Sequence, residues 1–393
     1  MNIKKALFYL AFISFFALAT GAHAAPAQTP TTDSRYLVKS TSNFWKKSFQ
    51  VRNVFDYGFT ADLTDWQLKL AKVFGVEVVP VKKLNILVTT KKVVSKPFIK
   101  TPTTQVGWGV EALYGDTLGS DMPSGGEDVN VAVLDTGILT THPDLKARIT
   151  ACSDFSGVDT FTKNSCDDKN GHGTQVAGII AADGGADGKG MYGVAPASNL
   201  MIYKTCASDG TCFSDDVAVA IRHAVDDKAQ IIVLSLGSDS ESQLINEAVA
   251  YATEQGVMVI SAVGNDGPYV GSLDYPASQL DVVSVGSVDS LLNVPTWSAR
   301  GGNLASTSYS KQAGDLEFVA PGVNIESTSI NSDYVTLSGT SMAAAHLAGL
   351  AAKEWQIEAE HPAESTRELL HRFSHDILPL GDDNASGWGM PSL

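Results

Sequence analysis

The sequence predicts an α/β protein in which helices flank a parallel sheet, preceded by a small α+β unit. Two observations lead to this fold class. Short β-branched runs alternate with helical patterns through roughly 290 C-terminal residues, enough to bury a sizeable core. The net charge of the chain also changes sign near residue 105, which separates this large part from a basic N-terminal part.

The alternation in the large part supports a sheet covered on both faces. Strands are expected at residues 129–134, 200–203, 231–234, 257–260 and 282–285, and helices at residues 175–182, 215–225 and 243–254. Strands buried on both faces are almost continuously apolar, as these are. We therefore expect parallel strands joined by helical crossovers.

The basic part has the pattern of a small folded unit. Strands are expected at residues 35–38, 49–51, 76–81 and 84–88, and a helix at residues 63–74. Residues 89–104 contain Lys91, Lys92, Lys96, Lys100, Pro97 and Pro102, which favours an extended connector. A plain flexible basic linker is the alternative for this part of the chain.

Residues 1–24 have the plan of a cleavable signal peptide. Lys4 and Lys5 precede a mostly apolar run over residues 6–19, which small residues follow. No later stretch approaches the roughly 20 apolar residues that a spanning helix needs. We therefore expect a secreted protein, extracellular or periplasmic, with no membrane association after signal removal.

The two parts of the chain carry opposite charge. Residues 25–104 contain 13 Lys and Arg against 5 Asp and Glu, a net charge of +8, whereas residues 105–393 contain 13 against 38, a net charge of −25. A basic segment directly before an acidic domain suggests an internal partner held partly by electrostatic complementarity. Nucleic acid is not an expected partner.

Three segments carry the chemistry. Asp135 ends the first apolar strand, His172 opens a helix between two glycines, and Ser341 lies where a small-residue turn enters an alanine-rich helix. Taken singly, each has a structural explanation, such as a turn former or a helix cap. The chain order Asp, His, Ser is that of the subtilisin triad and differs from those of chymotrypsin and the α/β-hydrolases.

With the segments around these residues, the chain resembles the subtilases, secreted subtilisin-like serine endopeptidases. The matching segments are residues 131–137, 142–145, 172–174, 193–196, 235–237, 264–265, 320–322 and 339–349. They occur in family order from about Trp108 onward. The resemblance implies a subtilisin-like fold and hydrolysis of protein or peptide substrates.

The resemblance also implies a role for each reacting group. His172 accepts the proton of Ser341 and returns it to the leaving amine, while Asp135 holds the imidazole tautomer. Asn265 is the family's side-chain donor to the oxyanion, beside the backbone N–H of Ser341. No cofactor is expected for catalysis.

Substrate contacts follow from the same resemblance. An edge strand of Gly210, Thr211 and Cys212 pairs with the substrate backbone, and the primary pocket is walled by Ser235, Leu236, Gly237, Ala262, Val263 and Gly264. The sequence assigns no acidic cluster to this pocket, so the side chain that it prefers stays open.

The domains expected are a signal peptide at residues 1–24, an inhibitor-type propeptide at 25–104 and the catalytic domain at 105–393. The propeptide acts as an intramolecular inhibitor in this interpretation, and the maturation cut is expected near residues 100–104. A monomer is expected.

Four cysteines, Cys152, Cys166, Cys206 and Cys212, allow three disulfide connectivities. Pairing neighbours is our choice, since each bridge then closes one surface loop of the catalytic domain. Zinc is the alternative, but no CxxC spacing supports it. By family resemblance, Asp144 is a calcium ligand. The GxGxxG of residues 188–193 follows a helix, the reverse of a dinucleotide site.

Two other functional classes lack the sequence features that they require. A catalytically dead family member acting as a scaffold requires a lost triad residue, and none is lost. A secreted esterase or lipase requires a GxSxG turn and the chain order Ser, Asp, His, and neither occurs.

Overall fold

A computed structural model of the chain describes residues 34–89, 99–119, 121–157, 161–304, 306, 310–377 and 381–393. Of these, the residues up to Val51 with Phe55–Pro80 form one compact unit, and Arg52–Val54 with Val81–Leu393 form a second. The expected signal peptide and residues 90–98 of the connector lie outside the described residues. Among the described helices, none has the length and apolar character to cross a membrane.

The first unit is a small antiparallel α+β structure. Its sheet has the order β2 (Val51–Phe55), β3 (Gly58–Asp62), β1 (Arg35–Val38), β4 (Val78–Pro80), and its helices are α2 (Asn43–Ser48) and α3 (Asp65–Val73). Thr64 and Gln67 form a reciprocal cap at the start of α3, which fixes where that helix begins. Trp45, Phe49 and Phe59 form the centre of its core.

The predicted elements of this unit differ from the structure in two places. Phe49 follows α2 instead of starting a strand, because Ser42 caps a short helix whose Trp45 turns into the core. The strand predicted at residues 84–88 does not join the small sheet. It is observed as β5 (Lys83–Ile86) in the second unit.

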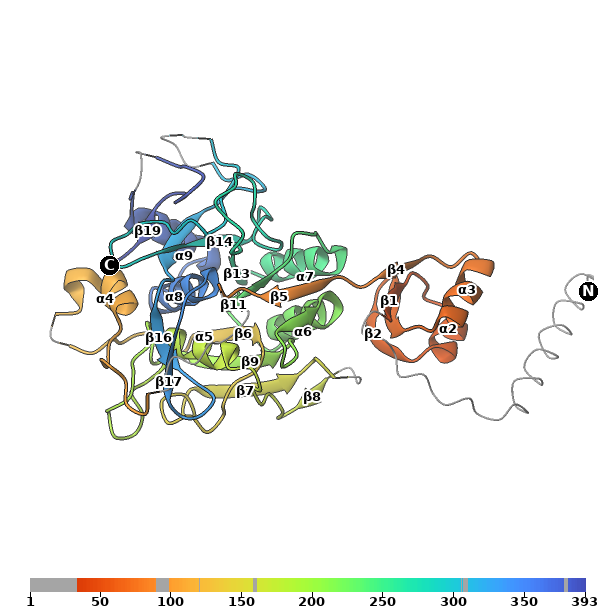
Figure 1. Ribbon diagram of the computed structural model, residues 1–393, viewed down its shortest axis with the longest axis horizontal. Helices are drawn as coiled ribbons and strands as arrows, with labels where there is room; N and C mark the ends of the chain where they lie inside the picture. Colours follow the sequence, from red (N-terminus) through yellow and green to blue (C-terminus); the bar gives the residue numbers. More distant parts are fainter. Residues whose placement is uncertain are drawn as a thin grey trace, which may run out of the picture. The chain divides into compact units, whose positions relative to one another are not determined.

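The second unit is built on an eight-stranded sheet (Figure 1). Its order is β15 (Phe318–Pro321), β14 (Val283–Val288), β13 (Met258–Ala262), β11 (Ile231–Leu234), β6 (Asn130–Asp135), β9 (Asn199–Lys204), β7 (Ile149–Asp154), β8 (Thr162–Lys163). Every pairing is parallel except that of β7 with β8. The central strands are buried along their length, which agrees with their apolar sequences.

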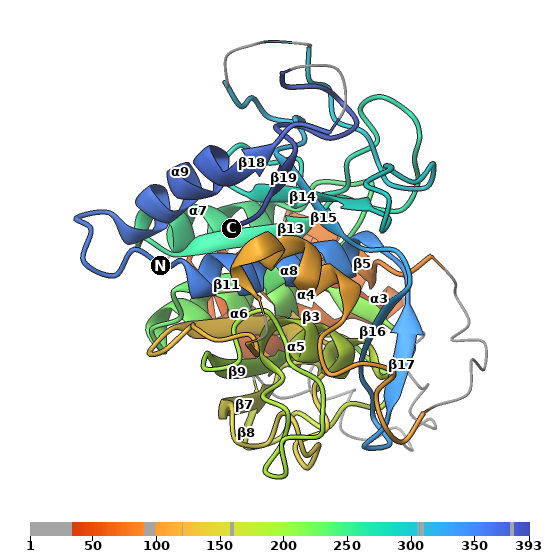
Figure 2. The same cartoon turned by 90° about the vertical axis from the view of Figure 1, so that its left-hand side faces the viewer.

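Helices cover both faces of this sheet. Helices α5 (His172–Ala181) and α8 (Thr340–Lys353) pack together on one face, and α6 (Ser214–Asp226) and α7 (Gln243–Glu254) on the other (Figures 1 and 2). Both α5 and α8 are buried almost throughout, since their small residues admit close approach. The predicted α/β fold class is confirmed.

Strand β5 is the middle strand of a separate three-stranded sheet. It lies between β10 (Thr211–Phe213) and β12 (Leu236–Gly237) and is antiparallel to both. The register pairs Asn85 with both Thr211 and Gly237. A strand from the N-terminal part of the chain therefore pairs with two strands of the second unit.

The remaining elements surround the main sheet. They are α4 (Trp108–Tyr114), the 3-10 turn η1 (Gly115–Thr117), β16 (Ile325–Thr328), β17 (Tyr334–Leu337), α9 (Pro362–Phe373), β18 (Ser374–His375) and β19 (Met390–Pro391). Disulfides join Cys152 to Cys166 and Cys206 to Cys212, which confirms the neighbour pairing.

Candidate active site

Asp135 and His172 form a buried polar pair in the site. Asp135 ends β6 and His172 begins α5, and Nδ1 of His172 lies 2.8 and 2.9 Å from the two carboxylate oxygens. Both residues are at most 2% exposed. Since a carboxylate only accepts hydrogen bonds, Nδ1 carries the proton and Nε2 keeps a free lone pair. Nε2 is buried and has no hydrogen-bond partner among the described residues.

Asp168 holds the start of α5 in place. Its carboxylate accepts hydrogen bonds from the backbone N–H groups of Asn170, Gly171 and Thr174 and from the hydroxyls of Thr136 and Thr174. Burial by itself raises the pKa of Asp168, but these hydrogen bonds outweigh it and the pKa is lowered. Asp168 was not among the predicted site residues, although an aspartate just before a helix is a capping signal.

Ser341 lies in the first turn of α8 and is fully buried. Its Oγ lies 2.8 Å from the carbonyl oxygen of Leu87 and 3.0 Å from that of Ser235, within hydrogen-bond range of both. No hydrogen bond joins Ser341 to His172 among the described residues. The serine hydroxyl therefore faces the chain segment that follows β5.

Asn265 follows the strand β13 and lies beside Ser341. Its Oδ1 accepts hydrogen bonds from the backbone N–H of Thr340 at 3.0 Å and from the Thr340 hydroxyl at 3.2 Å. These bonds fix the orientation of the amide, so Nδ2 points away from Thr340. Nδ2 is buried and has no partner among the described residues. The sequence analysis did not predict the orienting role of Thr340.

The segment after β5 runs through the predicted substrate cleft. The N–H of Ile86 donates to the carbonyl of Gly210 at 3.1 Å, and the N–H of Leu87 donates to that of Ser235 at 3.2 Å. Beyond the serine, the N–H of Thr89 donates to the carbonyl of Ser338 at 3.1 Å. The peptide bond between Leu87 and Val88 consequently lies against Ser341.

The predicted pocket residues lie around this segment. Gly210, Thr211 and Cys212 are on one side of β5, Ser235, Leu236 and Gly237 are on the other, and Ala262, Val263 and Gly264 are buried at the end of β13. The N–H of Gly264 donates to the hydroxyl of Thr340, which connects this wall to the serine turn.

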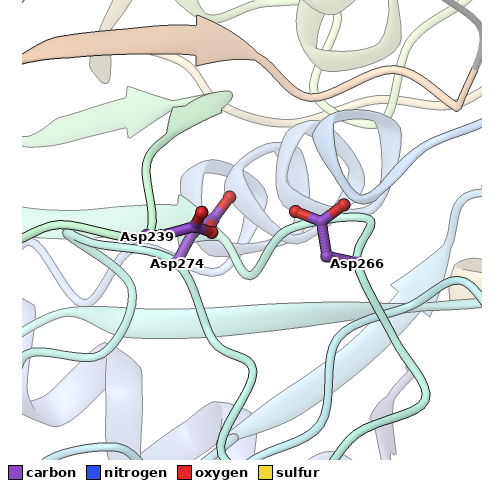
Figure 3. Close-up of side chains that lie close together, drawn as sticks. All are labelled: Asp239, Asp266 and Asp274. Carbon is purple, nitrogen blue, oxygen red and sulfur yellow. The ribbon is translucent and has the colours of Figure 1, made fainter.

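Three aspartates lie together beside these walls. Asp239, Asp266 and Asp274 each place a carboxylate oxygen within 4.8 Å of the others (Figure 3). Asp239 follows β12, whereas Asp266 and Asp274 both lie in the connection between β13 and β14. Their meeting was not predicted from the sequence.

Asp144 is buried against the loop that precedes β9. Its Oδ2 accepts hydrogen bonds from the N–H of Met191 at 2.9 Å and the hydroxyl of Tyr334 at 2.7 Å. Its Oδ1 accepts none from the described residues and lies so close to Gly190 that a Cβ there would approach to 2.0 Å. The amide of Gln105 meets the carbonyls of Gly188 and Gly190 on the same loop.

The comparisons with known proteins agree with this geometry. Residues 126–389 match the model of the subtilase family. The chain belongs to the subtilase family. This subtilase is 42% identical over 359 residues to a subtilisin of Bacillus sp. (strain TA39), covering 86% of this chain and 84% of that protein. It is 37% identical over 267 residues to Subtilisin Savinase of Lederbergia lenta, covering 67% of this chain and 89% of that protein.

Solved structures give the same assignment. The S41 psychrophilic protease superposes with a TM-score of 0.70 at 41% identity, covering 74% of this chain and 99% of that one. Sphericase superposes with a TM-score of 0.70 at 40% identity and the same coverage. This subtilase is a subtilisin-like serine endopeptidase that acts on protein substrates, as the sequence predicted.

Proposed function

We propose that Asp135, His172 and Ser341 are the catalytic triad and that Asn265 completes the oxyanion hole. The contact of Asp135 with His172 Nδ1 supports this proposal, because it leaves Nε2 ready to accept a proton. The partnerless Nδ2 of Asn265 supports it as well, since a buried donor without an acceptor is costly in the absence of a ligand.

The proposed reaction passes through an acyl-enzyme. Ser341 Oγ attacks the substrate carbonyl carbon while its proton moves to His172 Nε2, and Asp135 stabilises the imidazolium. Negative charge then develops on the carbonyl oxygen, where Asn265 Nδ2 donates. The C–N bond breaks as the amine takes the proton from His172. Water, deprotonated by the same imidazole, hydrolyses the ester and restores the serine.

The protein is proposed to be made as a zymogen that cleaves itself between Leu87 and Val88. The observation that carries this proposal is the position of the Leu87 carbonyl, 2.8 Å from Ser341 Oγ, with the flanking N–H groups paired to both sides of the cleft. This bond replaces the cut that we expected near residues 100–104. Residues 25–87 are then the inhibitory propeptide, and secretion follows from the signal peptide predicted at residues 1–24.

Self-cleavage is tested on the full-length precursor. Wild-type protein should process on its own and yield a chain that begins at Val88, identified by intact mass and N-terminal sequencing. Ser341→Ala should stay full length, whereas the exposed Ser240→Ala should process like wild type. A first product that begins anywhere else would refute the assigned bond, even with the triad correct.

The protease activity is tested separately on casein. Processed wild type should hydrolyse casein, and a covalent serine-hydrolase inhibitor should abolish the activity. An inactive wild type, after removal of the propeptide, would favour the scaffold function instead.

Calcium is proposed as a structural ion at Asp144. The free Oδ1 of Asp144, the Gly188 and Gly190 carbonyls and the Gln105 amide oxygen, with its amide turned, offer the oxygen ligands that calcium prefers. When bound, the ion would tie the N-terminal end of the catalytic domain to this loop. Chelation should lower thermal stability and speed autolysis; unchanged values for both would contradict the site.

A further inference from the structure

Among the described residues, no basic side chain pairs with the cluster of Asp239, Asp266 and Asp274. Asp274 is 3% exposed, while Asp239 and Asp266 are exposed. Asp239 is the one hydrogen-bond partner of the Asp274 side chain, which donates to it when protonated, and no N–H, hydroxyl or basic group reaches the Asp274 side chain within the described ranges. Figure 3 shows Asp239 and Asp274 adjoining, with Asp266 facing them. A buried acid in this setting lacks the positive partner that normally offsets its desolvation.

The cluster lies at the primary pocket. A Cβ added to Gly237 would lie 2.7 Å from Asp274 Oδ2, and one added to Gly264 would lie 2.9 Å from it. Both glycines belong to the predicted pocket walls, so the Asp274 carboxylate touches each wall. Asp266 directly follows Asn265, the proposed oxyanion donor. The lack of side chains at the two glycines leaves the carboxylate accessible from the pocket.

Leu87 indicates how a substrate side chain enters this pocket. Its carbonyl lies at Ser341 and its N–H is bonded to Ser235, which is the place of the residue on the acyl side of the cleaved bond. Leu87 is 8% exposed and belongs to the apolar core of the second unit. A side chain at this position is therefore largely buried, and we expect a longer one to bury its aliphatic part and carry its end toward the carboxylates beside Gly237 and Gly264.

On the basis of the proposed function, we propose that Asp274, with Asp266 and Asp239, makes the primary pocket selective for lysine or arginine on the acyl side of the cleaved bond. The aliphatic part of such a side chain packs where Leu87 lies, and its charged end supplies the missing cation. Burial, then Asp266 and Asp239, raise the pKa of Asp274 to about 7, which reflects the same unbalanced charge.

The leucine at the maturation bond is compatible with this selectivity. Self-cleavage is intramolecular, so the high effective concentration of the bond replaces tight binding in the pocket. Leucine fills the apolar wall and leaves the carboxylates without a cation. Substrates in solution have no such advantage and depend on the charged contact.

The test compares tetrapeptide p-nitroanilides that differ only in the residue next to the leaving group. Processed wild type at pH 9 in saturating calcium should have a higher kcat/KM for the lysine and arginine peptides than for the leucine peptide, and hardly cleave the glutamate peptide. Asp274→Asn should lower kcat/KM for lysine by about 30- to 100-fold and change that for leucine less than about 3-fold. Retained leucine cleavage shows that the variant is folded.

Two further variants complete the design. Asp266→Asn, at an exposed member of the cluster, should lower lysine cleavage by about 3- to 10-fold because solvent screens its charge. Asp281→Asn removes an exposed charge outside the cluster and should leave the preference unchanged. A wild type that prefers leucine, or an Asp274→Asn enzyme that keeps a lysine preference, would overturn the inference while the protease function stands. No turnover of any peptide would remove the proposed function and the inference together.

Discussion

At the scale of single residues, the proposed reacting groups could be selected from the sequence because each lies in a short segment with its own local geometry. Asp135 ends an apolar strand, and His172 and Ser341 begin helices. The supporting groups were not predictable in this way. Asp274 meets Gly237 only after two separate loops fold together, and its contact with Gly264, earlier in its own loop, has no sequence signature either.

Asn265→Ala should lower kcat sharply with little change in KM. Its Nδ2 is held toward the site by the bonds from Thr340 to Oδ1, and an oxyanion donor acts mainly in the transition state. In subtilisin, losing this donor costs about 10²- to 10³-fold in kcat, and we expect the same range here. The exposed Asn293→Ala serves as control. A change confined to KM would place Asn265 in substrate binding instead.

The preference for lysine over leucine should depend on pH. The pKa of Asp274 is raised to about 7, so the acid is protonated below that value and ionised above it. The lysine-to-leucine ratio of kcat/KM should therefore rise as pH increases through about 7. Any pH dependence of the catalytic step itself is common to both peptides and therefore cancels in the ratio of their kcat/KM values.

The same raised pKa affects stability with a definite sign. Asp274 binds its proton more tightly when folded, so its contribution is fully present below the ordinary value of 3.8 and is lost as pH rises through about 7. Asp274→Asn should remove most of this loss of stability with rising pH. It should also make the lysine-to-leucine ratio of kcat/KM nearly independent of pH. A ratio in wild type that does not change between pH 5 and 9 would contradict the assignment.

At the scale of elements, the alternation of β-branched runs with helical patterns predicted most strands of the main sheet and its helices. It did not predict which strands pair with each other. Strand β5 has the same local pattern as a strand of the small unit. Its partners, β10 and β12, lie more than a hundred residues further along the chain. Helix α9 was missed because much of its anchoring is ionic: Arg367 makes a bidentate pair with the buried Glu317 of the loop before β15.

The two disulfides should have different functional effects. Cys152–Cys166 closes a loop of about 15 residues away from β5, and its removal should cost about 3 kcal/mol of stability with KM unchanged. Cys206–Cys212 closes a shorter loop, worth about 2 kcal/mol, but Cys212 lies in β10, which pairs with β5. Its removal should also raise KM.

One variant replaces both cysteines of the first disulfide by serine, and a second variant does the same for the other disulfide. Urea unfolding and peptide kinetics are compared between the two, so that each variant is the control for the other. An equal rise in KM for both would show that the second bridge has no special role in the cleft.

At the scale of the whole molecule, the net charges of propeptide and enzyme depend on where the chain is cut. A cut after Leu87 gives smaller opposite charges than a cut near residue 104. The proposed cleavage after Leu87 would leave Lys91, Lys92, Lys96 and Lys100 on the mature enzyme. Residues 25–87 then have 9 basic and 5 acidic groups, a net charge of +4, and residues 88–393 have 17 and 38, a net charge of −21. The opposite signs persist, but the attraction is weaker than the boundary at residue 104 implied.

Inhibition by the cleaved propeptide should therefore weaken with salt, but only moderately. Screening reduces attraction between a +4 segment and a −21 enzyme, whereas the backbone pairing of β5 with β10 and β12 is nearly insensitive to ionic strength. Between 50 mM and 500 mM NaCl, we expect the inhibition constant to rise by about tenfold. The inhibition constant is measured at each salt concentration from the recovery of activity after self-cleavage, which is followed with a peptide substrate.

The exposed pair Lys69→Gln and Lys72→Gln should reduce this salt dependence without altering processing at Leu87. If the inhibition constant is the same at both salt concentrations, the propeptide is held by strand pairing and apolar contacts alone, and the charge asymmetry of the sequence has another cause.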